Sequence, residues 1–151
     1  MKKHALEAYR RHLPHWRAPE STYMVNWCLK TRQPDLSGPE RSIVTSAIRH
    51  FEDDRYGLHA FVVMNDHAHV IVTPRTDHDL EDIVRSWKSF TANRMQRVFG
   101  RVGVIWQDEY YDRILRNARD YQEKVRYILE NPARRWPRLI KYPWVGLGKA
   151  G

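Results

Sequence analysis

Cysteine is almost absent from this chain of 151 residues, and the sequence shows neither a membrane span nor a signal-peptide core. Cys28 is the only cysteine, so the sequence excludes an intramolecular disulfide and a zinc site built from cysteines. No apolar run approaches the length of a membrane span, and the N-terminal Met1–His4 leads into no signal-peptide core. We therefore expect a cytosolic protein. Repeats, low-complexity tracts and linkers are also lacking, which favours a single domain over residues 1–151 with basic tails at both ends.

Acidic residues are in the minority. The chain has 18 Asp and Glu residues against 26 Lys and Arg, a formal net charge of +8. Such an excess favours a polyanionic partner, with nucleic acid the leading candidate, although a basic protein without such a partner would have the same composition. The hydrophobic fraction of 42% and the six tryptophans are typical of a folded globule.

The most informative motif lies in the stretch from Val62 to Val72. Apolar residues stand on both sides of Asn65-Asp66, which is typical of a turn, so the stretch is predicted to form a β-hairpin. Because side chains alternate along a strand, His67 and His69 should share one face and Ala68 should point to the other. Two such imidazoles can bind a divalent ion, but a His-x-His pair alone is a weak signal.

A second candidate motif lies on a predicted helix near the C-terminal end. Four apolar residues recur there at helical spacing: Tyr121, Val125, Ile128 and Leu129. Asn117 and Asp120 resemble a capping arrangement at its start, and Pro132 predicts that it ends at Asn131. Tyr127 and Asn131 are four residues apart, so they should lie on one helical face beside the apolar stripe. Alone, they would be interpreted as a surface tyrosine and a helix-ending asparagine.

The remaining elements follow from periodicity and turn residues. Strands are predicted at Thr22–Leu29, Leu58–Met64, His67–Thr73, Val104–Trp106 and Tyr110–Leu115. One helix should follow a capping box of Ser37 and Glu40, and a longer one should run from Thr76–Asp79 to Gly100. The inner side of the longer helix is predicted to comprise Leu80, Ile83, Val84, Trp87, Phe90, Met95, Val98 and Phe99. The order β-α-β-β-α-β-α predicts an α+β fold, an antiparallel sheet with helices on one face. The open face would then carry the two histidines, and the last helix could pack against it.

Four blocks occur along the chain in a distinctive order. They are His67-Ala68-His69, Ser86–Ala92, Trp106–Asp112 and Arg126–Pro132. In this order they resemble the single-tyrosine HUH transposases, most of all the REP-associated tyrosine transposases, and the resemblance covers about Leu13 to Trp144. Two departures stand out. Asn65-Asp66 precedes the first histidine where Pro-Asn is usual in the family, and Ala68 is smaller than the usual residue between the histidines.

The resemblance implies a ferredoxin-like sheet and strand cleavage and joining on single-stranded DNA. It implies a metal held by His67, His69 and Asn131, and mixed nitrogen and oxygen ligands suit Mg²⁺ or Mn²⁺. It implies attack on the scissile phosphate by Tyr127, which leaves a 5′-phosphotyrosine link and a free 3′-OH. The implied substrates are short palindromic REP hairpins with a single-stranded flank. The REP-associated members act as monomers, and the short connection Arg116–Arg119 agrees with a tyrosine that acts within its own chain.

Several basic residues are candidates for phosphate contacts, which fix position without reading bases: Arg10, Arg11, Lys88, Arg94 and Arg113. Two alternatives stay open from the sequence. One is a non-catalytic nucleic-acid-binding protein on the same fold. The other is a zinc-dependent hydrolase using His67 and His69, which is weakened because no further histidine or carboxylate stands at a recognisable ligand spacing.

Overall fold

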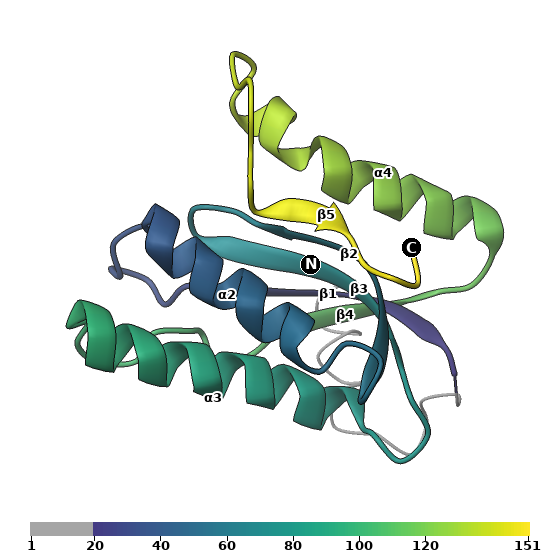
Figure 1. Cartoon of the computed structure of the whole chain (residues 1–151), viewed down its shortest axis with the longest axis horizontal. Coiled ribbons are helices and arrows are strands. Elements are labelled where there is room, and N and C mark those ends of the chain that lie inside the picture. Colours follow the sequence, from purple (N-terminus) through teal and green to yellow (C-terminus); the bar gives the residue numbers. More distant parts are fainter. Residues whose placement is uncertain (1–19) are drawn as a thin grey trace.

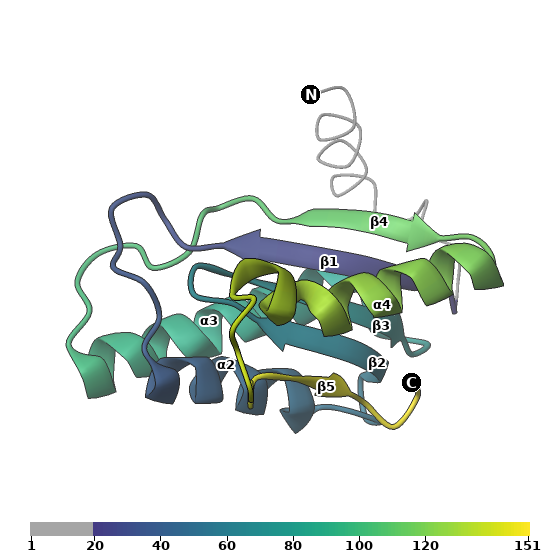
Figure 2. The same ribbon diagram turned by 90° about the horizontal axis from the view of Figure 1, so that it is seen from above.

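The computed structural model describes residues 20–151, which form an antiparallel five-stranded sheet with helices on both sides (Figure 1). The strands run in the order β4-β1-β3-β2-β5 across the sheet, as Figure 2 shows. Their bounds are β1 Thr22–Cys28, β2 Tyr56–Val63, β3 His67–Pro74, β4 Tyr111–Leu115 and β5 Val145–Leu147. The helices are α2 Gly38–His50, α3 Leu80–Phe99 and α4 Ala118–Arg135. The predicted α+β architecture is confirmed.

The two faces of the sheet carry different layers. Helices α2 and α3 share one face, and α4 lies on the other (Figure 1). The main core, under α2 and α3, includes Trp27, whose ring stacks on that of Trp87 with centroids 5.4 Å apart. A smaller apolar cluster joins the opposite face to α4 and includes Val62, Ile71 and Ile128. The last helix therefore packs on the face that the first two leave open, as expected.

Local signals at the helix starts act as predicted. Ser37 caps α2 in a complete capping box with Glu40, because each accepts a hydrogen bond from the backbone N–H of the other. Asn117 caps α4 through a hydrogen bond from the Asp120 N–H at 2.8 Å. Helix α3 ends at Phe99 and is capped by Gly100, whose φ of 69° is a left-handed conformation that glycine adopts without strain.

The predicted inner side of α3 is wrong at three positions. Phe90, Val98 and Phe99 are 52%, 55% and 40% exposed. At about 100° per residue, Phe90 and Phe99 lie about a quarter turn from the centre of the buried stripe. Val98 lies in the last turn, and the last buried side chain of α3 is Met95. The helix is thus longer than the core that it covers.

The predicted end of the tyrosine helix is also wrong. Helix α4 continues through Pro132 to Arg135, and Pro132 is buried. A proline inside a helix removes one backbone hydrogen bond and crowds the preceding turn. The Arg134 guanidinium donates a 2.6 Å hydrogen bond to the Tyr127 carbonyl, which joins the turns before and after the proline. Burial of the proline ring and this side-chain bond offset the local preference to stop.

Two smaller differences concern strands. The segment Val104–Trp106 forms no strand of the sheet; Trp106 makes an isolated bridge to Leu29. The C-terminal segment adds the short strand β5 to the edge of the sheet beside β2, where Phe61 pairs with Gly146. Sequence periodicity does not reveal a strand of three residues.

Candidate active site

Strand β3 brings the two histidines together. His67 and His69 share the face of the sheet on which α4 packs, and their ring centroids are 4.8 Å apart with an angle of 83° between the planes. Ala68 is fully buried in the core on the opposite face. The strand period of two thus places both imidazoles side by side, as predicted from the sequence.

Asp66 fixes the orientation of the first imidazole. The Nδ1 of His67 lies 2.6 Å from Oδ1 of Asp66. An ionised carboxylate only accepts hydrogen bonds, so Nδ1 of His67 carries the proton and donates it. In the tautomer with this proton the lone pair is on Nε2, which is the atom left for a metal. Metal-binding histidines commonly donate their other ring N–H to a carboxylate in this way. The sequence showed Asp66 only as a departure from the family pattern.

His69 is buried and kept neutral. It is 7% exposed, and its pKa is lowered from 6.5 to about 3, first by burial and then by electrostatic interaction with His67 and Arg134. Its Nδ1 has no hydrogen-bond partner among the described residues. A neutral imidazole beside a second one, with a buried nitrogen that lacks a protein partner, fits a metal-ligating pair.

Helix α4 presents Tyr127 to this pair. The tyrosine ring lies edge-on to His69 with ring centroids 5.6 Å apart and an angle of 84° between the planes. Tyr127 is 42% exposed, so part of this residue is accessible to a large substrate. The Arg134 guanidinium lies 4.6 Å from the centre of the tyrosine ring. Arg134 is seven residues after Tyr127 and therefore on the same helical face, a relation that exists only because the helix continues through Pro132.

Asn131 is the third predicted ligand. It lies one turn after Tyr127 within α4, and its side chain is partly exposed. Among the residues that the structure describes, no group of three His, Cys, Asp or Glu side chains could hold a metal ion. A third protein ligand would thus come from another residue type, and the amide oxygen of Asn131 is on the right helix.

Tyr121 is the other tyrosine of the same helix, and it has a structural partner. Its hydroxyl is hydrogen-bonded at 2.9 Å to Nδ1 of His59, and its ring lies edge-on to that histidine. It packs against the apolar cluster between α4 and the sheet. The interpretation of Tyr121 as a core residue agrees with this geometry.

The predicted phosphate-contact residues are spread over the molecule. Arg10 and Arg11 lie outside the described residues. Lys88 and Arg94 belong to α3, across the sheet from the histidines, and the Lys88 ammonium donates hydrogen bonds to the carbonyls of Gln107 and Asp108. Arg94 is exposed.

Arg113 lies on β4 and forms an ion pair with Asp120 at 3.2 Å. Its strand partner Met24 packs against the apolar cluster under α4, so Arg113 is on the same face of the sheet as the histidines. Of the described phosphate-contact candidates, Arg113 alone shares this face.

The comparison with known families agrees with this geometry. The family described as "Transposase IS200 like" matches residues 18–131, most of the chain. The chain belongs to this family.

None of the described helices has the length and apolar character needed to cross a membrane.

Individual relatives point to one branch of the IS200-like transposases. The chain is 29% identical over 126 residues to the REP-associated tyrosine transposase of Escherichia coli (strain K12), covering 82% of this chain and 69% of that protein. It is also similar to the solved structure of a REP-associated tyrosine transposase bound to a REP hairpin. That match has a TM-score of 0.69 and 26% identity, and it covers 86% of this chain and 78% of the other.

A protein from Deinococcus radiodurans R1 shares the fold, with a TM-score of 0.54, 21% identity, and coverage of 77% of this chain and 93% of the other. The resemblance to the REP-associated tyrosine transposases is thus confirmed, and the chain is a DNA-processing transposase, an enzyme that cleaves and joins strands.

Proposed function

We propose that this transposase is a metal-dependent single-stranded DNA endonuclease and strand transferase that acts on REP-type hairpins, with Tyr127 as its nucleophile. One observation carries the proposal: α4 sets an accessible tyrosine with its ring 5.6 Å from His69, which in turn lies beside His67. The hairpin-bound relative supports the substrate class. In this proposal, the described residues supply both a ligand pair and a nucleophile on one face of the sheet.

The covalent step follows from these positions. The Tyr127 oxygen attacks the scissile phosphorus, and the bond from phosphorus to the 3′ oxygen breaks. The phenol loses its proton and the departing oxygen gains one, so the products are a 5′-phosphotyrosine link and a free 3′-OH. Attack by another 3′-OH reverses the step and joins strands. Arg134 holds a positive charge beside the tyrosine ring, where it favours the negative charge that develops during attack.

His67, His69 and the amide oxygen of Asn131 would hold the divalent ion. Two imidazole nitrogens and one oxygen suit Mg²⁺ or Mn²⁺, and histidine ligation favours Mn²⁺ in affinity. When bound, the ion supplies Lewis acidity to the scissile phosphate. The residues of the chain contribute orientation: Asp66 fixes the His67 tautomer, and burial keeps His69 unprotonated.

We further propose that the enzyme acts as a monomer with Tyr127 in cis. Helix α4 packs on the sheet of its own chain through Ile128 and Val125. The connection from β4 to α4 consists of two residues, Arg116 and Asn117, which is short for an exchange between chains.

The test is the formation of a covalent adduct. Wild-type protein with Mn²⁺ and a labelled hairpin carrying a single-stranded flank should give a protein-linked DNA band on a denaturing gel. Tyr127→Phe should give none, because only the nucleophilic oxygen is removed. Tyr121→Phe is the matched control from the same helix and should still form the adduct.

An adduct with Tyr127→Phe would assign the nucleophile to another residue. Hairpin binding by the wild-type protein with neither adduct nor cleavage would favour the non-catalytic DNA-binding alternative.

A further inference from the structure

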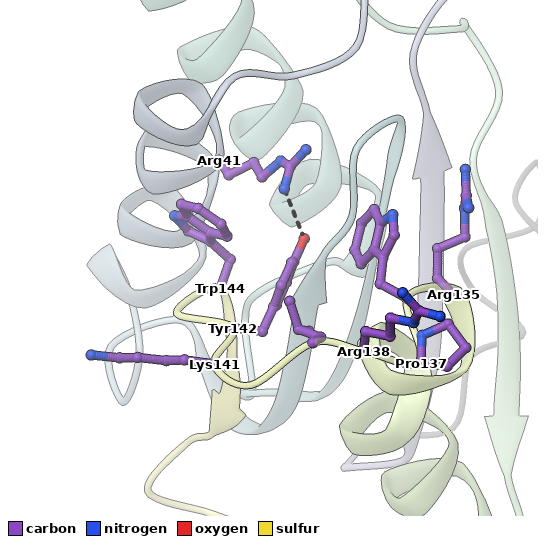
Figure 3. Close-up of a pocket in the computed structure, with 9 residues that line it drawn as sticks. Arg41, Arg135, Pro137, Arg138, Lys141, Tyr142 and Trp144 are labelled. Atoms are coloured by element: carbon purple, nitrogen blue, oxygen red, sulfur yellow. Dashed lines mark hydrogen bonds between the residues drawn. The ribbon is translucent and has the colours of Figure 1, made fainter.

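A basic, aromatic pocket lies beyond the C-terminal end of α4. It has a volume of about 730 Å³ and is formed by residues 135–144 together with Arg41 of α2 (Figure 3). Its side chains come from segments that are about 100 residues apart in sequence. Cations and aromatic rings dominate the lining: Arg41, Arg135, Trp136, Arg138, Tyr142 and Trp144.

The aromatic rings of the pocket are held in place. Trp136 and Tyr142 stack with ring centroids 5.5 Å apart and 27° between the planes, and Trp144 lies edge-on to Tyr142. The Tyr142 hydroxyl donates to the Val63 carbonyl, and the Trp144 indole N–H donates to the Ser42 hydroxyl at 2.9 Å. All three rings remain partly exposed. A partly exposed ring fixed in this way costs little ordering entropy when a flat ligand stacks on it.

The charge of the pocket is entirely positive. Arg41, Arg135, Arg138 and Lys141 line it, and no carboxylate does among the described residues. Within that same part of the chain, none of these four cations forms an ion pair. Arg41 is oriented by its bond to the Leu36 carbonyl. Guanidinium groups that form no ion pair, beside partly exposed aromatic rings, fit a ligand that carries both phosphate and a flat ring.

The pocket begins at the C-terminal end of α4, the helix that carries Tyr127, and extends to Arg41 of α2. Trp136 follows α4 directly and is nine residues after Tyr127, roughly 14 Å along the helix at 1.5 Å per residue. Tyr142 contacts Val63, which pairs with Ala68 between the two histidines. A DNA strand that leaves the active site along α4 reaches this pocket within a few nucleotides.

We infer that the pocket binds an unpaired nucleotide of the single-stranded flank of the DNA substrate. Its base stacks on the exposed part of the Trp136–Tyr142 pair, and its phosphates contact Arg138 and Lys141. This inference rests on the proposed function for its substrate class. Stacking of this kind tolerates any base, so the pocket holds the flank in position and leaves the sequence to be read elsewhere.

The test measures binding without metal in the Tyr127→Phe background, so that it does not depend on cleavage. The probes are a hairpin with a single-stranded flank, the same hairpin with one abasic flank position at a time, and a blunt hairpin. One abasic position should weaken binding of the Tyr127→Phe protein on the order of tenfold. Adding Trp136→Leu, which keeps apolar volume but removes the stacking surface, should abolish that dependence and leave blunt-hairpin affinity unchanged.

A second variant tests the phosphate contacts and leaves the apolar packing intact. Arg138→Gln with Lys141→Gln should reduce the slope of log affinity against log salt for the flanked hairpin by about 0.7 for each lost contact. The matched control, Arg85→Gln with Arg97→Gln, removes the same charge from α3 across the sheet and should leave the difference between flanked and blunt hairpins unchanged.

Three results would overturn the inference. Equal loss of flanked and blunt binding in Trp136→Leu would mean a structural role for the ring. Equal effects of the two charge pairs would mean that only net charge matters. A Trp136-dependent dimer in sedimentation without DNA would assign the pocket to a second copy of the chain. Failure of the adduct assay with intact flank dependence would instead refute the proposed chemistry and leave the pocket assignment standing.

Discussion

Removal of the Asp66 carboxylate should weaken metal binding without disturbing the fold. Asp66 accepts the Nδ1–H of His67 at 2.6 Å and so keeps the lone pair of the ring on Nε2. Its own side chain is 57% exposed, and it lies in the turn before β3, outside the two apolar clusters. Asp66→Ala leaves His67 free to adopt the other tautomer and to rotate.

The magnitude follows from the exposure of the pair. Loss of a carboxylate behind a metal-binding histidine costs about 10- to 100-fold in metal affinity. Solvent screens this pair, because the aspartate is more than half exposed and the histidine side chain is 25% exposed. We therefore expect the lower end of that range, about tenfold for Asp66→Ala. Asp66→Asn should lose less, because its amide oxygen can still accept the hydrogen bond.

Calorimetric titration of Mn²⁺ into the DNA-free protein measures this effect directly. Asp35→Asn is the matched control, because Asp35 is a nearby carboxylate that accepts a hydrogen bond from the Asn65 amide and not from a histidine. Nitrogen chemical shifts of His67 provide a second readout, since Asp66→Ala should shift the tautomer balance even without metal. Equal weakening by Asp35→Asn and Asp66→Ala would show that net charge, and not the tautomer, sets the affinity. Wild-type affinity in Asp66→Ala would refute the positioning role altogether.

Two further predictions concern acid stability and assembly. The pKa of His69 is lowered to about 3 in the folded protein against 6.5 as the ordinary value, so the unfolded chain binds the extra proton first as pH falls. Its contribution to stability is fully present above about pH 6.5 and is lost by about 1.4 kcal/mol per pH unit below it. Urea unfolding at pH 7 and pH 5 measures this: between the two pH values, the free energy of unfolding should fall less for His69→Leu than for wild type. A mixture of Tyr127→Phe and His67→Ala proteins should stay inactive in the adduct assay, because each active site is completed within one chain; restored cleavage would show a site shared between chains.

The sequence determined the parts of this protein that depend on local periodicity. A strand period of two is enough to place His67 and His69 together, and helical spacing is enough to place Tyr127 and Asn131 on one face. The caps at Ser37 and Asn117 are likewise local, because a side chain there bonds the backbone three residues away. The order of strands and helices, with a turn between β2 and β3, therefore sufficed for the α+β class.

The tertiary structure decided what distant segments do to one another. It carried α4 through Pro132, against the local preference, because the proline ring is buried and Arg134 bonds back to the Tyr127 carbonyl across the proline. It left Val98 exposed, because α3 is longer than the core beneath it. It also brought residues 135–144 against Arg41 to form the pocket. Burial and contact between residues far apart in sequence depend on how complete elements pack, and no local pattern contains that information.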